Sequence, residues 1–158
     1  MGDVVFEAKL KDYIRQHGVT AEHRHFDQSC HSVAEAAAAV GAVAEDFVKN
    51  ICFVAPDGRL VVCIVKGEDK VDRNLAARIV GVEKLKTASP ELMLEKTGYP
   101  VGGTPSFGFD GPVTVLVDER VMEKEMVWTG GGSQHALVKI APVDLVAANG
   151  GKVCRIRQ

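Results

Sequence analysis

The residues best suited to binding an anion or a carbonyl group are one lysine, one histidine and two glycine-rich turns. Lys49 opens an apolar run, Gly102 and Gly103 form the first turn, residues 130–132 form the second, and His135 follows it. Backbone N–H groups in such turns converge on negative charge, and a strand-end lysine holds a phosphate as a point charge. Taken singly, Lys49 also fits a solvated strand end, and the glycines fit ordinary turns. Together they predict a site that positions a substrate without a side-chain nucleophile.

The first glycine turn lies in an unusual stretch, TGYPVGGTPSFGFDGP, residues 97–112. This stretch is rich in both glycine and proline, and it also carries Tyr99, Phe107 and Phe109. Glycine permits close approaches and unusual backbone angles, whereas proline removes conformational freedom. A flexible linker needs neither in such a dense mixture, so we expect a loop that folds around a ligand.

Other reactive arrangements are absent from the sequence or fit a simpler role. There is no nucleophile elbow, P-loop, dinucleotide-binding or H-E-x-x-H motif. His23 and His25, with His31 nearby, lack a carboxylate or cysteine at ligand spacing, so we interpret them as solvated histidines on an edge strand. Asp69 and Asp72 are possible acid or base groups, but Asp72 also fits a helix cap. We therefore expect no metal and no cofactor.

Composition limits the classes of partner. The chain has 158 residues, 46% of them hydrophobic and 25% charged, and a net charge of −2. This balance fits one globular domain and argues against broad nucleic-acid binding, although it permits a local basic pocket. The N-terminus has no long apolar run, so we expect a cytoplasmic protein that does not bind membranes. The four cysteines have no zinc spacing, and we interpret them as reduced thiols.

Helices and strands are interspersed along the chain. A Pro-Asp-Gly turn between two β-branched runs predicts a hairpin over 48–65, in which Cys52 faces Cys63 only if Asp57 and Gly58 form a two-residue turn. Cap residues, glycines and apolar periodicity predict the remaining elements. We expect helices at 5–18, 32–41, 72–81, 89–98 and 142–150. We expect further strands at 21–26, 113–118 and 152–157, and two strands, or a strand and a return, over 126–140. The predicted fold class is α/β (α+β), with antiparallel pairing in a mixed sheet.

The order of several segments resembles a known family. Gly98-Tyr99, Gly102-Gly103, a proline and Gly108 resemble the G-Y-x-x-G-G-x-x-P-x-G loop of the YbaK/ProX family. These proteins are aminoacyl-tRNA deacylases, and they include the editing domain inserted in bacterial prolyl-tRNA synthetases. One departure is Ser106, which stands where the family commonly has proline, directly after Pro105. Further segments are similar to the family: Ser32 with its alanine-rich helix, Lys49, Lys66-Gly67 with Asp72 and Leu75, Asp118, residues 130–132, Leu137 and Asp144-Leu145.

The resemblance implies a site and a substrate. It implies one editing domain over residues 1–158, with a mixed, largely antiparallel and partly barrel-like sheet flanked by helices. The substrate would be the ester at the acceptor end of a tRNA mischarged with a small amino acid such as Ala, Cys, Ser or Thr, with tRNA-Pro as a possible carrier and a synthetase as a possible partner. Implied catalytic residues are Lys49, Gly102 and Gly103. Implied substrate-binding residues are Ser32, Tyr99, Thr104, Pro105, Asp118, Gly130, Gly131 and His135.

Two other classes of protein share these features. A non-catalytic module that binds aminoacyl-tRNA or a nucleotide would use the same lysine and glycine turns, but it would protect the ester instead of releasing the amino acid. A phosphate-ester or nucleotide hydrolase would usually need a metal. Turnover separates the first alternative from a deacylase, and sensitivity to a chelator separates the second.

Overall fold

The protein structure is a computed structural model that describes residues 2–158. Over this range the helices are α1 (Gly2–Gln16), α2 (Val33–Val40), α3 (Arg73–Val80), α4 (Pro90–Thr97) and α5 (Pro142–Asn149), with short 3-10 helices at Ala44–Asp46 and Glu119–Glu123. The strands are β1 (Ala21–His25), β2 (Val48–Val54), β3 (Leu60–Lys66), β4 (Lys86–Thr87), β5 (Thr114–Asp118), β6 (Val127–Gly130), β7 (Ala136–Ile140) and β8 (Lys152–Cys154). None of the helices in this range is both long enough and apolar enough to cross a membrane.

The strands form two sheets. The larger has the order β4-β2-β3-β5-β8, in which β2 pairs antiparallel with β3 and β4, while β5 pairs parallel with β3 and β8. The smaller has the order β1-β7-β6 and is antiparallel throughout. The predicted α+β class and the mixed, largely antiparallel pairing are confirmed. The strands of residues 2–158 divide between two sheets and do not close into a barrel.

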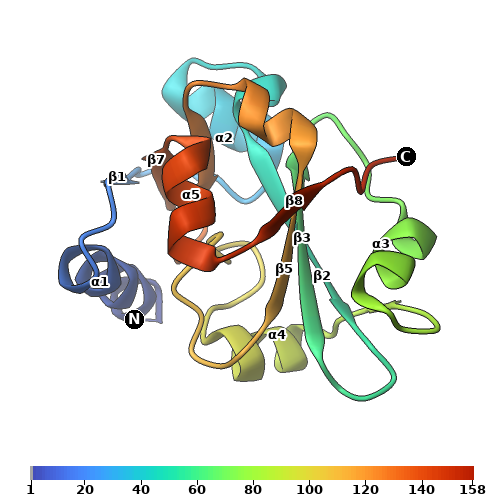
Figure 1. Cartoon of the computed structure of the whole chain (residues 1–158). Coiled ribbons are helices and arrows are strands. Elements are labelled where there is room, and N and C mark those ends of the chain that lie inside the picture. The colour runs from blue at the N-terminus through green and yellow to red at the C-terminus, as the bar shows by residue number, and fades with distance from the viewer. Residues whose placement is uncertain (1) are drawn as a thin grey trace.

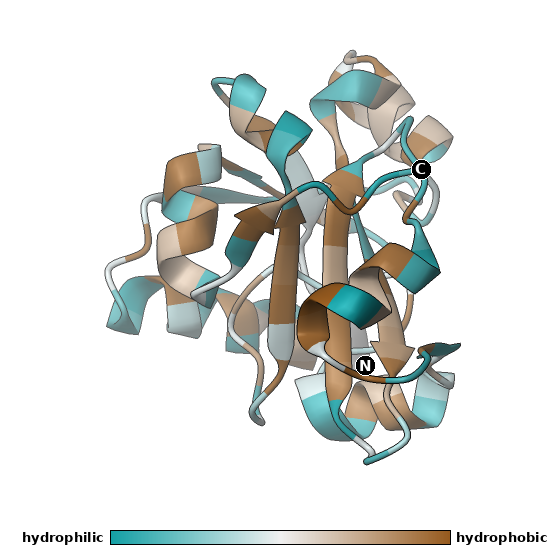
Figure 2. Ribbon diagram, turned by 45° about the vertical axis from the view of Figure 1, so that its right-hand side comes forward, coloured by the Kyte–Doolittle hydropathy of each residue, from teal (hydrophilic) through white to brown (hydrophobic). Residues whose placement is uncertain are grey.

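The larger sheet is covered on both faces, as Figure 1 shows for α3 on one side and α5 on the other. Val61 and Cys63 pack with Ala76 of α3, whereas Val62 and Ile64 pack with Leu145 of α5. Every residue of β3 is buried for this reason. The central strands accordingly appear as a hydrophobic band in Figure 2.

The predicted helix ends are confirmed where caps define them. Ser32 and Glu35 form a capping box at the start of α2. Asp72 caps α3 and Ser89 caps α4, each through a hydrogen bond from the backbone N–H three residues later. These bonds satisfy donors that the first turn of a helix leaves free. The capping box therefore fixes the residue at which α2 begins.

The hairpin of β2 and β3 has a three-residue loop rather than a two-residue turn. Val54 pairs with Leu60, and the Ala55 N–H donates to Arg59 O at 2.9 Å. In this register Cys52 lies opposite Val62, so Cys52 and Cys63 face different cores and remain free thiols. The one-residue shift that would separate the two cysteines is thus the arrangement found.

Candidate active site

A small cavity lies where the start of β2 meets the start of α2, the loop after α4 and the end of β6. Its volume is about 210 Å³. Sites that hold drug-sized ligands have volumes of about 300–1,000 Å³. The smaller volume of this cavity suits a small chemical group. Five of the predicted site residues line it: Ser32, Lys49, Gly102, Thr104 and Gly130. The cavity therefore brings together segments from four distant parts of the chain.

Lys49 supplies the positive charge of the cavity. Its side chain is half-buried, and among residues 2–158 it has no hydrogen-bond or ion-pair partner. Burial lowers the pKa of Lys49, the nearby Lys70 lowers it further, and Asp69 opposes both effects. A half-buried ammonium group that forms no direct ion pair favours binding of an anion or a polar oxygen.

The first glycine turn has a backbone amide without an acceptor at a residue that lines the cavity. The Gly103 N–H donates to Pro100 O at 3.2 Å and closes a β-turn over residues 100–103. Gly102 occupies the third position of this turn with a φ of +89°, which a residue with a side chain rarely adopts. Within residues 2–158 no acceptor takes the Gly102 N–H. Of the two amides in this glycine pair, that of Gly102 is the one without an acceptor in the described residues.

The two glycine turns are in direct contact. The Gly132 N–H donates to Gly103 O at 2.8 Å. A Cβ atom on Gly103 would lie 2.5 Å from Ser133 N, and one on Gly130 would overlap Thr104 O. Side chains at these positions would push the turns apart, so the glycines permit the close approach that forms one wall of the cavity.

A polar network joins the loop to the strands beneath it. Asn50, next to Lys49 on β2, donates from Nδ2 to Thr104 O at 2.9 Å. Ser106 donates to Asn50 Oδ1 at 2.8 Å, and its hydroxyl lies 2.6 Å from Thr129 Oγ1. Sequence reasoning missed Asn50, although a polar residue within an apolar strand was a usable signal. The network fixes the loop in the place where the family commonly has a second proline.

Residues 27–148 match the family model described as an aminoacyl-tRNA editing domain. The chain belongs to this family. The resemblance inferred from the loop motif is thereby confirmed, and the matched range includes every residue named above as lining the cavity.

Several known proteins are similar to this chain. An uncharacterized protein of Bacillus subtilis, YwhH, is 25% identical over 128 residues, which cover 81% of each chain. A proline–tRNA ligase of Nitratidesulfovibrio vulgaris is 31% identical over 104 residues, 66% of this chain but only 18% of the ligase. A solved structure described as a candidate trans-editing enzyme for prolyl-tRNA synthetase has a TM-score of 0.89 at 30% identity, covering 96% of both chains.

Two predicted substrate-binding residues of the editing domain lie away from the cavity. Tyr99 is fully buried beneath α1, where Lys9 Nζ lies 4.8 Å from its ring centroid. Burial raises the pKa of Tyr99, and its hydroxyl has no partner among residues 2–158. Asp118, also fully buried, accepts hydrogen bonds from the Ile156 N–H at 2.9 Å and from Arg157 Nη1 at 3.1 Å. These contacts hold the C-terminal segment against β5.

Four other predicted residues are not among those that line the cavity: Gly103, Pro105, Gly131 and His135. Gly131 O lies 2.8 Å from His23 Nε2, and His135 Nδ1 lies 3.2 Å from Gln28 O. Burial lowers the pKa of His23, which favours its neutral form. The two histidines therefore contact the second glycine turn and the residues next to it.

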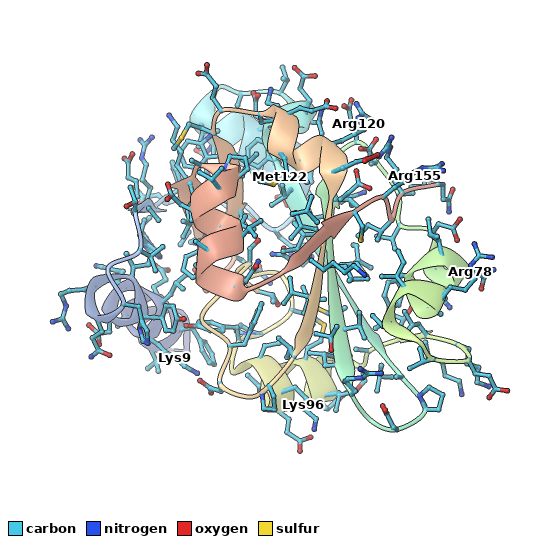
Figure 3. All side chains as sticks on the ribbon, viewed as in Figure 1. Lys9, Arg78, Lys96, Arg120, Met122 and Arg155 are labelled. Carbon is cyan, nitrogen blue, oxygen red and sulfur yellow. The ribbon has the colours of Figure 1, made fainter. Side chains whose placement is uncertain are left out.

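Asp69, Asp72 and His25, which were possible acid, base or metal-binding groups in the sequence, each have a hydrogen-bond partner. Asp69 accepts a hydrogen bond from Arg120 at 2.7 Å, and Arg120 is labelled in Figure 3. Asp72 caps α3, and His25 lies 2.9 Å from Glu7. His31 lines the cavity and packs against Gly102. Of these groups, only His31 is placed to contact a ligand in the cavity.

A larger groove of about 740 Å³ lies between α1 and the loop after α4. Its cation is Lys9, labelled in Figure 3, whose Nζ is 2.6 Å from Asp110 and 3.2 Å from Gly98 O. This ammonium group is already neutralised, unlike that of Lys49. The smaller cavity is therefore the better candidate active site of the editing domain.

Proposed function

We propose that this protein is a trans-acting deacylase that hydrolyses the ester of mischarged tRNA, with residues 1–158 acting as one cytoplasmic editing domain. The observation that supports it most strongly is the half-buried Lys49, which has no ion-pair or hydrogen-bond partner within residues 2–158 and lines the same cavity as Gly102, whose N–H has no acceptor there. Membership of the aminoacyl-tRNA editing family supports the same substrate class.

In the proposed reaction, water attacks the carbonyl carbon of the ester. The Gly102 N–H donates to the oxygen on which negative charge develops, and Lys49 holds the terminal ribose or its phosphate in place. The bond between the carbonyl carbon and the ribose oxygen then breaks, and the proton of the attacking water passes to that oxygen. The products are a free amino acid and a tRNA with a free terminal hydroxyl. The ester is already activated, so the reaction needs no protein nucleophile. The neighbouring ribose hydroxyl is a suitable proton carrier.

The size of the cavity supports a small amino acid as the group removed. A volume of about 210 Å³ leaves little room beyond the ribose for a large side chain. One methylene group changes discrimination in such a pocket by about 1–3 kcal/mol. We therefore propose Ala, Cys, Ser or Thr as the misattached residue, with tRNA-Pro as the first carrier to test because proline–tRNA ligases are among the relatives.

A deacylation screen tests the proposal. The protein is incubated with a panel of tRNAs, including tRNA-Pro, charged with Ala, Cys, Ser, Thr or the cognate amino acid, and released amino acid is measured. The parent protein should hydrolyse at least one mischarged tRNA faster than the cognate one. Lys49→Ala should lower kcat/KM by about 10- to 150-fold, because a hydrogen bond to a charged group contributes about 1.5–3 kcal/mol.

Lys70→Ala is the matched control. Lys70 is exposed and does not line the cavity, yet its charge influences Lys49. The control should keep nearly the parent rate. A parent protein that binds the mischarged tRNA and lengthens the life of its ester would refute the deacylase and support a binding module instead.

A further inference from the structure

A buried carboxylate on α1 contacts the second glycine turn. Glu7 is only 8% exposed. Ser133 Oγ donates to Glu7 Oε2 at 2.7 Å, and His25 Nδ1 lies 2.9 Å from Glu7 Oε1. A buried carboxylate is stable only when such partners replace water. The contact of Glu7 with the turn is therefore specific and requires a defined position of α1.

Ser133 directly follows the second glycine turn, residues 130–132, which supports the cavity wall. The Ser133 hydroxyl also accepts a hydrogen bond from the His135 N–H at 3.0 Å. It therefore joins Glu7 to the backbone that follows the turn. The preceding residue, Gly132, donates its N–H to Gly103 O at 2.8 Å. Gly103 is adjacent in sequence to Gly102, whose amide is free. A displacement of Ser133 would thus be passed through two bonded contacts to the cavity.

The turn is held from both sides. A Cβ atom on Gly132 would lie 2.8 Å from Phe6 O, and one on Gly103 would lie 2.5 Å from Ser133 N. The turn therefore fills the space between α1 and the loop without slack. Closely packed elements of this kind transmit a displacement instead of absorbing it.

We propose that Glu7 is a positioning residue of the deacylation site, which fixes Gly103, and with it Gly102, through Ser133 and Gly132. The proposal rests on the proposed function. It makes α1 a working part of the site, although the match to the editing-domain family begins only at residue 27. Glu7 itself does not line the cavity, so it acts through the turn.

Hydrogen exchange of the Gly132 amide in the protein without tRNA is the first test. Glu7→Ala and Ser133→Ala should each raise its exchange rate by about 10-fold relative to core amides, as expected for the loss of one hydrogen bond. The two changes combined should have no larger effect than either alone, because they break the same contact. Glu7→Gln keeps an oxygen that accepts from Ser133, so it should restore most of the protection.

Deacylation at a temperature where all variants are folded is the second test. Glu7→Ala should lower kcat by about 10-fold with little change in KM, because the loss falls on the geometry of the transition state. Leu10→Ala is the matched control, since Leu10 is fully buried on α1 and makes none of these hydrogen bonds. The control should melt at a lower temperature and retain kcat and Gly132 protection.

Two outcomes would overturn the proposal: parent-like protection of Gly132 in Glu7→Ala, or an equal fall in kcat for Leu10→Ala and Glu7→Ala. The second would mean that Glu7 only attaches α1. If the parent protein deacylates no tRNA, the proposed function fails. Hydrogen exchange still decides then whether Glu7 positions the turn, because that measurement uses no substrate.

Discussion

Substitution of Gly103 by alanine tests how closely the two glycine turns are packed. The added Cβ would lie 2.5 Å from Ser133 N and 2.7 Å from the carbonyl carbon of Gly132, where real Cβ contacts essentially never fall below 3.0 Å. Both neighbours are backbone atoms, so no side chain can rotate away. The turns would have to separate, and the hydrogen bond between Gly132 and Gly103 would lengthen.

The size of the effect follows from this overlap. Overpacking a closely packed site costs roughly 1–3 kcal/mol of unfolding free energy. In a protein of this length each kcal/mol lowers the melting temperature by about 2–4 °C, so Gly103→Ala should melt roughly 2–12 °C below the parent. Its deacylation kcat should fall as well, because Gly102 moves with Gly103. Backbone strain does not contribute to this loss of stability, because Gly103 does not have a positive φ.

Thermal unfolding and deacylation assays on Gly103→Ala and Gly58→Ala test whether the two glycine turns interlock. Gly58 has a φ of +88° and open space around it, so alanine there costs about 1 kcal/mol through backbone strain alone. The control should lose stability and keep kcat, whereas Gly103→Ala should lose both. A Gly103→Ala protein with the melting temperature and kcat of the parent would refute the reasoning that the turns interlock.

Three further predictions concern stability. Ser106→Ala should lower the free energy of urea unfolding by about 1–3 kcal/mol, because the partly buried Asn50 Oδ1 loses its donor. Asp118→Asn should cost about 1–3 kcal/mol in thermal melts and leave the deacylation rate unchanged. Hydrogen bonds from Ser133 and His25 outweigh burial and hold the pKa of Glu7 below its usual 4.5. The free energy of unfolding of the parent protein should therefore decrease as pH falls from about 4.5 through the folded-state pKa of Glu7. Glu7→Gln should make this decrease smaller.

Helix ends were predictable from the sequence because caps are local. Ser32 with Glu35, Asp72 and Ser89 each bind a backbone group within three residues. Such bonds depend on neighbouring residues only, so spacing alone identifies them. The start of α2, which forms one side of the cavity, could therefore be placed from the sequence.

Sheet organisation was less accessible, because it depends on distant pairing. Spacing predicted the hairpin but left its register open, and the loop of residues 56–58 decided which faces Cys52 and Cys63 occupy. Strand β1 pairs with β7, which lies more than a hundred residues further along the chain. No local pattern predicts that β1, β6 and β7 form a separate sheet.

The candidate site could be predicted in part. A charged residue in an apolar strand and a glycine pair identified Lys49 and Gly102, both of which line the cavity. Tyr99 and Asp118 belong to the same sequence motifs, but they make structural contacts elsewhere. A motif records every residue that its loop needs, and the sequence does not separate those that contact a ligand from those that hold the loop. Burial and hydrogen-bond partners make that separation.

Ser106 makes the loop rigid in a different way from the proline that the family commonly has at this position. A second proline after Pro105 would restrict the backbone directly. Ser106 instead restricts it through its hydroxyl, which lies 2.8 Å from Asn50 Oδ1 and 2.6 Å from Thr129 Oγ1. Asn50 is next to Lys49 and also holds Thr104 O, so these bonds tie the loop to the strand that carries the cavity's cation. The departure from the family pattern therefore preserves the relation between Lys49 and the Gly102 amide, which the proposed reaction requires.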